Sequence, residues 1–137
     1  MGGRLPAAAL AVVLHAATAL ACGVCVEDRL AAVYDHRVVE RALGARHHVA
    51  FWGLEGAVPG RDAQRREIVR SLDGITGVDR GTVRVSLEYG TMSFAFDPKR
   101  APMRAVLRSA QHALAAGGLT PTLLRVIDDS TGLKPGS

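Results

Sequence analysis

The sequence has few cysteines and few aromatic residues, and it lacks the motifs of the common enzyme classes. Its only two cysteines, Cys22 and Cys25, confine any thiol chemistry to one short motif. One tryptophan, two tyrosines and three phenylalanines are too few to build a platform on which nucleic-acid bases stack. No glycine-rich loop has the Lys and Ser or Thr that cradle a phosphate, and serines and histidines form no recognisable nucleophile motif. These absences predict a protein that is not an enzyme and that binds no nucleic acid.

The charge balance is mildly basic, and 137 residues supply enough chain for one domain with a modest core. The net charge is +4, and most of the basic residues are arginines. Four of them fall close together on a predicted helix at residues 61–72: Arg61, Arg65, Arg66 and Arg70. We interpret this cluster as a solvated helix face, with weak attraction to anionic lipid as the alternative.

Residues 1–21 have the pattern of a secretory signal peptide. Arg4 supplies the positive charge of the N-terminal region, and residues 5–20 are almost wholly apolar. Ala19-Leu20-Ala21 matches the small-x-small pattern of a cleavage site. Cleavage after Ala21 would make Cys22 the mature N-terminus of an exported, periplasmic or secreted protein. Two alternatives stay open, and both would anchor the protein to a membrane. Residues 19–22 partly resemble a lipoprotein box, which would place a lipid on Cys22, and an uncleaved leader approaches the length of a spanning helix.

The next segment, residues 22–45, combines the Cys-x-x-Cys motif with a predicted N-terminal amphipathic helix. Apolar residues recur at spacings of three and four over residues 24–43, with charged residues elsewhere. This apolar stripe consists of Val26, Leu30, Val33, Tyr34 and Val38. The pattern predicts one continuous helix, with Gly44 as its C-cap.

The order of elements over residues 46–128 predicts an α+β fold. A strand at 49–54 is apolar on both alternating sets of positions, which is typical of a strand covered on both faces. A helix at 61–72, a hairpin of strands 82–89 and 92–96 around Gly90, a helix at 101–116 and a strand at 123–127 follow. In the hairpin, Val83, Val85, Leu87 and Tyr89 are expected to point inward, and residues 129–137 are expected to form a flexible tail.

This succession is the ferredoxin-like βαββαβ sandwich, whose two helices cover one face of the sheet. The opposite face would be bare, although the strand at 49–54 is apolar on both sides. We therefore expect the additional N-terminal helix to cover that second face.

From residue 48 to residue 126 the sequence resembles heavy-metal-associated domains, the fold of small copper chaperones and of modules in metal-pumping ATPases. The resemblance rests on residues 72–78 (LDGITGV), 83–87 (VRVSL), 94–98 (FAFDP) and a helix that ends at Gly117-Gly118. It implies the ferredoxin-like fold. The family places its metal-binding Cys-x-x-Cys between the first strand and the following helix, where this chain has residues 54–61 (LEGAVPGR) and no thiol. The resemblance therefore supports metal binding only if Cys22 and Cys25 have taken over that role.

Two cysteines separated by two residues can bind one soft metal ion together. Thiolates suit Cu(I) and Zn(II), and two of them are enough for near-linear Cu(I). A position at a helix N-terminus favours the thiolate form, because the exposed amides and the helix dipole stabilise negative charge. Zinc would want about four ligands, and only histidines remain to supply them. We therefore predict a Cu(I) site first and a Zn(II) site second, at Cys22 and Cys25.

Three histidines are weaker ligand candidates. On a continuous helix, His36 would share nearly the same face as Cys25 but lie roughly 16 Å along the axis, too far to share an ion. His47 and His48 are adjacent at a strand entrance, so their side chains point to opposite faces and at most one of them can join a given site. Met92 is expected to pack in the core, and His112 has no evident partner.

Other readings of the cysteine pair also remain. A thiol-disulfide redox accessory is one alternative, because Cys-Gly-Val-Cys resembles the active-site pair of thioredoxin-like proteins, although no strand of the mature chain precedes it. An inert disulfide would close only a four-residue loop and stabilise the fold by roughly 2 kcal/mol or less. A third possibility is a protein-interaction module of the cell envelope that has kept the fold and lost the metal.

Overall fold

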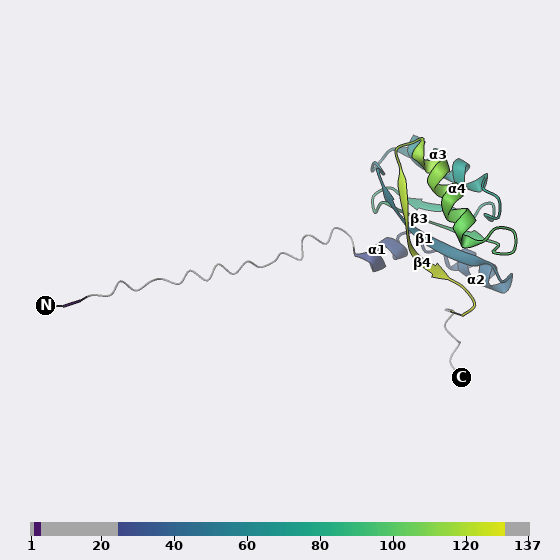
Figure 1. Cartoon of the computed structure of the whole chain (residues 1–137), viewed down its shortest axis with the longest axis horizontal. Coiled ribbons are helices and arrows are strands. Elements are labelled where there is room, and N and C mark those ends of the chain that lie inside the picture. Colours follow the sequence, from purple (N-terminus) through teal and green to yellow (C-terminus); the bar gives the residue numbers. More distant parts are fainter. Residues whose placement is uncertain (1, 4–24, 131–137) are drawn as a thin grey trace.

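The computed structural model describes residues 2–3 and 25–130, so the predicted signal peptide, Cys22 and most of the predicted tail lie outside the described residues. The described elements are α1 (Val26–Ala31), α2 (His36–Gly44), β1 (His48–Glu55), α3 (Asp62–Asp73), β2 (Arg84–Ser86), β3 (Thr91–Phe96), α4 (Met103–Ala115) and β4 (Thr120–Ile127). The strands form one antiparallel sheet in the order β2-β3-β1-β4 (Figure 1). This order confirms the predicted ferredoxin-like α+β fold. Within the described part of the chain, no helix is both long and apolar enough to cross a membrane.

Helices α3 and α4 cover one face of the sheet and enclose the larger core. Trp52 of β1 is fully buried there and stacks on Phe94 of β3, with ring centroids 5.6 Å apart. The helices contribute five buried apolar residues to this core, namely Ile68, Leu72, Val106, Ala110 and Leu114. Met92 belongs to the same core and is fully buried, which confirms its packing role.

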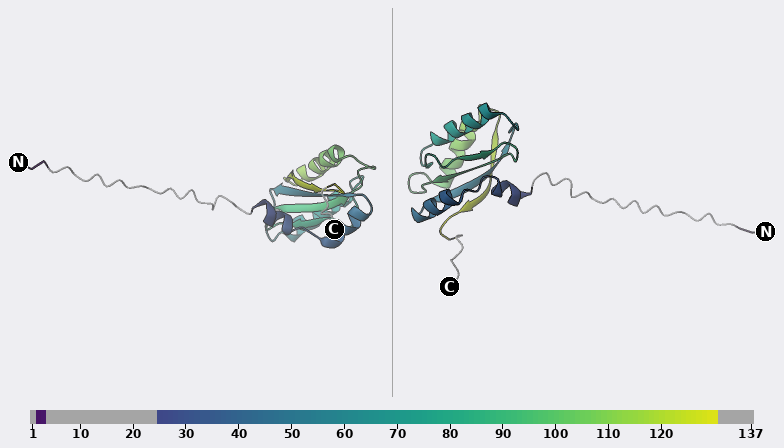
Figure 2. Two further views of the ribbon diagram at one scale, coloured as in Figure 1. Left: turned by 90° about the horizontal axis from the view of Figure 1, so that it is seen from below. Right: turned by 180° about the vertical axis from the view of Figure 1, so that it is seen from behind.

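Helices α1 and α2 cover the opposite face, as the two-sided apolar character of β1 predicts. Figure 2 shows these helices on the side of the sheet away from α3 and α4. They enclose a second core whose buried members are Leu30, Val33, Val39, Ala42, Val49, Phe51 and Ala95. The fold is therefore a three-layer arrangement in which the sheet is buried on both sides.

The prediction of one continuous helix over residues 24–43 is wrong, because the chain breaks at residues 32–35. In a continuous helix the Val33 carbonyl would accept the amide of Arg37. Instead the buried Ser93 hydroxyl donates to the Val33 carbonyl at 2.7 Å, and the Arg37 amide donates to the Asp35 carboxylate at 2.9 Å. Asp35 thus caps a new helix, α2, which can lie across the sheet at its own angle.

The predicted first strand of the hairpin, residues 82–89, is also too long. Only Arg84–Ser86 pairs with β3, because residues on both sides turn away. The Thr82 hydroxyl donates to the Asp79 carbonyl at 2.6 Å, and the Gly90 amide donates to the Leu87 carbonyl at 3.3 Å. Val83 and Leu87 are buried as expected, whereas Tyr89 is 43% exposed rather than inward.

The Asp35 cap should make the stability of the N-terminal layer sensitive to acid. The Val38 amide and the Arg84 side chain both donate to this carboxylate, and together they hold the pKa of Asp35 below its ordinary value of 3.8. A lowered pKa in the folded state stabilises the fold at pH values above the unfolded-state pKa, and that stability is lost as the pH falls through the folded-state pKa.

Substitution Asp35→Asn should keep the cap, since asparagine is an equally good capping residue, but at neutral pH it should lose the stability that the charged carboxylate and its Arg84 partner contribute. The substitution should also remove the loss of folding stability that protonation of Asp35 causes, which begins near pH 4 and grows at lower pH. Urea unfolding at pH 7 and at pH 3 measures both effects. If the variant loses as much stability as the parent between these two pH values, Asp35 is not the acid-sensitive group.

Candidate functional site

Cys25 is the one cysteine within the described residues, and it lies at the surface. It is the N-cap of α1, with extended backbone, and its side chain makes no capping hydrogen bond. Its thiol donates to the Asp28 carboxylate, with Sγ and Oδ2 3.1 Å apart. The thiol is therefore accessible to an incoming ion, while the geometry of the pair with Cys22 lies outside the described residues.

His36 is not on the same helix as Cys25, so the distance argument from a continuous helix does not apply. It begins α2, and its Nε2 lies 3.1 Å from Oε1 of Glu40 one turn further on. Both side chains are largely exposed. His36 is thus a surface histidine paired along its own helix.

His47 and His48 do diverge, as their adjacent positions predict. The rings of His48 and Phe96 form a T-shaped contact, with ring centroids 5.5 Å apart. His47 instead lies between two carboxylates from other segments: Nδ1 is 2.7 Å from Oδ2 of Asp79, and Nε2 is 3.6 Å from Oδ2 of Asp97. Sequence analysis did not single out either aspartate. The two approach His47 because the Val78–Phe96 bridge and the end of β3 bring their segments to the start of β1.

Heavy-metal-associated domains, which the sequence resembles, carry their thiols in the loop between β1 and α3. In this chain the side-chain amide of Gln64 bridges that loop. Gln64 accepts from the Val58 amide at 2.8 Å and donates to the Gly56 carbonyl at 3.2 Å. Gly56 itself has a φ of +90° and packs against the Gly118 carbonyl. The loop is therefore a packed turn, with none of its side chains a soft metal ligand.

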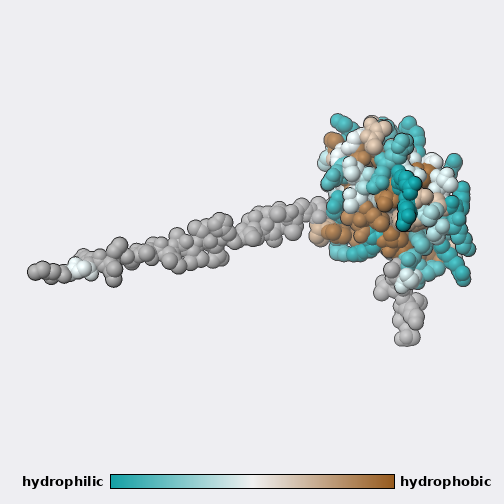
Figure 3. Space-filling view, in the orientation of Figure 1, coloured by the Kyte–Doolittle hydropathy of each residue, from teal (hydrophilic) through white to brown (hydrophobic). Residues whose placement is uncertain are grey.

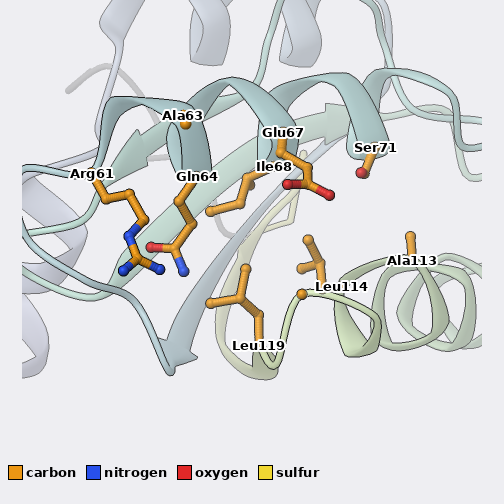
Figure 4. A pocket seen from close by; sticks show the side chains of 10 residues that line it. Arg61, Ala63, Gln64, Glu67, Ile68, Ser71, Ala113, Leu114 and Leu119 are labelled. Atoms are coloured by element: carbon orange, nitrogen blue, oxygen red, sulfur yellow. The ribbon is translucent and has the colours of Figure 1, made fainter.

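A small cavity of about 170 Å³ opens beside this loop, between α3 and α4 (Figure 4). Its floor is apolar, with Ile68, Leu114 and Leu119, and Arg61 and Glu67 stand at its rim. Such a volume holds a single side chain or a few water molecules. Arg61, Arg66 and Arg70 are exposed, as expected of a solvated helix face, whereas Arg65 is half-buried and lies 3.7 Å from Glu88.

A larger groove of about 350 Å³ lies on the other side of the sheet, between α1 and β4. Its walls include Leu30, Phe51 and Ile127, and the half-exposed Tyr34 stacks parallel to Phe51 at a centroid distance of 6.4 Å. An ion pair between Glu27 and Arg125, 2.8 Å long, borders it. Figure 3 shows apolar surface between the two points at which the grey segments join the described chain.

Within residues 25–130, no group of three or more His, Cys, Asp or Glu side chains is arranged to hold a metal ion. A metal site at Cys25 must therefore draw its other ligands from Cys22, from the chain terminus or from outside the described part. The predicted ligands Cys25, His36, His47 and His48 do not meet in one place.

Comparison with known proteins gives structural neighbours only. No protein-family model matches the sequence, and no curated protein sequence is similar to it. One similar solved structure is a copper binding domain from HMA7, a P-type ATPase, with 18% identity, a TM-score of 0.47, and coverage of 58% of this chain and 96% of that one. Another is oxidized MerP from Ralstonia metallidurans CH34, with 14% identity, a TM-score of 0.43, and coverage of 56% and 96%. At these values the likeness concerns the arrangement of the elements.

Proposed function

We propose that the protein is an exported binder or carrier of a soft metal ion, Cu(I) first and Zn(II) second, held by Cys22 and Cys25. The observation that carries this proposal is the exposed Cys25 thiol at the start of α1, three residues after the only other cysteine. Two thiolates are sufficient for near-linear Cu(I), so the site needs no further ligand from the domain.

The surroundings of Cys25 are compatible with an ion that is taken up and passed on. The thiol lies outside both cores, and its one hydrogen bond is to the exposed Asp28 carboxylate. A thiolate cannot donate that bond, so the Asp28 contact is lost when the thiol ionises to bind a metal. At such an exposed position a bound Cu(I) ion would be accessible to a partner protein.

The test is a Cu(I) titration of the reduced protein that begins at Cys22, in competition with a chromogenic chelator. We expect one tightly bound Cu(I) per chain. The double variant Cys22→Ser, Cys25→Ser should lose at least about a hundredfold in affinity, since each single thiolate is a far weaker site than the pair.

The control is His112→Gln, which removes an exposed histidine on α4 and leaves both thiols in place. Its Cu(I) affinity should equal that of the parent. Equal affinities of the parent and the double cysteine variant would exclude the thiol site.

A protein-interaction role is the second candidate, because one specific feature favours it. The groove between α1 and β4 leaves the Tyr34 ring half exposed above Phe51, next to β4, which is an edge strand of the described sheet. In that role the cysteines would be dispensable, and Tyr34→Asp would abolish binding to an envelope partner. The double cysteine variant would bind that partner as the parent does.

A further inference from the structure

Strand β4 forms an edge of the described sheet, so one of its two sides has no neighbouring strand there. The Leu54 amide donates to the Gly90 carbonyl at 2.7 Å, so the backbone groups of Leu54 point toward β3. Those of the preceding residue, Gly53, therefore point toward β4, where Thr122 lies opposite. The N–H and C=O of Leu123, the next residue of β4, consequently point away from the sheet.

The same alternation applies on the other side of the irregularity in the pairing of β4 with β1. The backbone groups of Phe51 also point toward β4, and Arg125 lies opposite, so the N–H and C=O of Val126 point outward. The remaining outward position belongs to Pro121, which has no N–H to satisfy. The edge therefore offers N–H groups at two positions, Leu123 and Val126.

On one face of the sheet, this edge borders the apolar groove between α1 and β4. Phe51 and Ile127 contribute to the walls of the groove, and the Tyr34 ring beside them is 48% exposed. Side chains of a strand added next to β4 would enter the groove on this face. An aliphatic side chain there would gain apolar contacts and cover part of the Tyr34 ring.

On the other face, the same edge borders a basic side of α4. Helix α4 packs against β4, whereas α3 packs against β2 at the far side of the sheet. Arg104 and Arg108 are exposed and one turn apart on α4, on the side of the helix opposite Ala113, which lines the cavity toward α3. The two arginines therefore lie on the side of α4 toward the β4 edge. Leu123, which is opposite Trp52 in the sheet, belongs to this same face.

The segment that contains α4 and β4 carries charge of one sign. Residues 98–127 include no aspartate or glutamate, and their basic residues are Lys99, Arg100, Arg104, Arg108 and Arg125. Within residues 25–130, only Arg125 of these five forms an ion pair, with Glu27. A second copy paired along β4 would bring two such basic segments together, whereas an acidic partner would be attracted to this edge.

We propose that the β4 edge accepts an extended segment of a partner protein in which apolar and acidic residues alternate. Successive side chains of a strand point to opposite faces, so the apolar ones would enter the groove beside Tyr34 and the acidic ones would face Arg104 and Arg108. Backbone hydrogen bonds to Leu123 and Val126 would supply affinity, and the two faces would supply specificity. This inference rests on the second candidate function, the protein-interaction role, and names the chemistry of its partner.

The experiment is a titration of the protein that begins at Cys22, carrying Cys22→Ser and Cys25→Ser, with a synthetic peptide as long as the eight-residue β4. Valine and glutamate alternate in the peptide, and its ends are capped. Backbone amide NMR signals locate the binding, and fluorescence anisotropy of the labelled peptide gives the affinity. We expect saturable shifts and slower hydrogen exchange at the Leu123 and Val126 amides. The same peptide with lysine in place of glutamate should not bind.

Two pairs of charge reversals separate the arginines at the edge from net charge. The double variant Arg104→Glu, Arg108→Glu should bind the valine–glutamate peptide about tenfold more weakly, because two attractions become repulsions. The matched control is Arg66→Glu with Arg70→Glu, which makes the same change at two exposed positions one turn apart on α3. Its affinity should stay within about twofold of the parent, since screening by salt weakens distant charges.

The proposal is overturned if the peptide leaves the Leu123 and Val126 signals unmoved, or if both double variants lose affinity equally. Shifts of these signals with protein concentration alone would overturn it as well, because a second copy would then occupy the edge. If Tyr34→Asp abolishes binding to an envelope partner while the peptide does not bind, the interaction role stands and the acidic strand is wrong. The thiols are absent from this test, so its result is independent of the Cu(I) site.

Discussion

Replacing Gly56 by alanine is expected to lower the free energy of unfolding by about 3 kcal/mol or more, because strain and overlap add. Gly56 has a φ of +90°, which side-chain-bearing residues adopt only at a cost of order 1–3 kcal/mol. An added Cβ would also collide with the Gly118 carbonyl oxygen, which belongs to the backbone and cannot rotate aside. Urea unfolding followed by Trp52 fluorescence measures the loss, since Trp52 is the only tryptophan and is fully buried.

Gly60 provides the matched control in the same loop. Its φ is +76°, and no atom lies within 4 Å of the position of an added Cβ. Gly60→Ala should therefore lower the free energy of unfolding only by the cost of the positive φ, about 1 kcal/mol. Equal losses in the two variants would show that the contact with Gly118 does not constrain the loop. The larger loss at Gly56 would mean that the turn between β1 and α3 is packed too tightly to open around an ion.

The architecture of the domain could be predicted from the sequence because it follows from local patterns. Alternation of apolar residues on both faces of β1 requires two covering layers, and both exist: Trp52 packs toward α3 and α4, and Phe51 packs toward α1 and α2. The predicted role of the N-terminal segment as the second cover is thereby confirmed. The periodicity of apolar residues and the order of the helices and strands were sufficient to predict the layers of the domain.

The break between α1 and α2 could not be predicted in the same way. The apolar stripe continues through it, because Val33, Tyr34 and Val38 still fall at helical spacings. After α1 the amides of Val33 and Tyr34 donate to carbonyls only three residues back, those of Leu30 and Ala31. The Val33 carbonyl accepts from the hydroxyl of Ser93, sixty residues further along the chain. Asp35 is a local capping signal, and it could have suggested a new helix start there.

The His47 cluster was beyond prediction for a related reason. His47, Asp79 and Asp97 have no motif spacing, and only strand pairing brings their segments together. The predicted end of the second hairpin strand at residue 96 is correct for the backbone, and it says nothing about where the carboxylate of Asp97 points. Candidate ligands adjacent in sequence, such as His47 and His48, instead separate to different surroundings.

Phe51→Ala should destabilise the domain by about 3–5 kcal/mol, which is the usual cost of truncating a fully buried phenylalanine. Phe51 is 1% exposed and lies at the centre of the second core, beneath the Tyr34 ring. Its loss would remove the surface on which α1 and the start of α2 rest and would enlarge the groove beside β4. Urea unfolding and amide hydrogen exchange of α1 and α2 measure the stability and the integrity of this layer.

Two further variants make the result interpretable. Phe94→Ala removes a fully buried ring from the larger core and should cost a similar 3–5 kcal/mol, whereas Tyr89→Ala removes a 43% exposed ring and should cost less than about 1 kcal/mol. If Phe51→Ala resembled Tyr89→Ala instead of Phe94→Ala, the N-terminal layer would be a loose attachment. Similar costs for the two buried rings mean that the N-terminal layer unfolds together with the rest of the domain, so that α1, which Cys25 precedes, is an integral part of the fold.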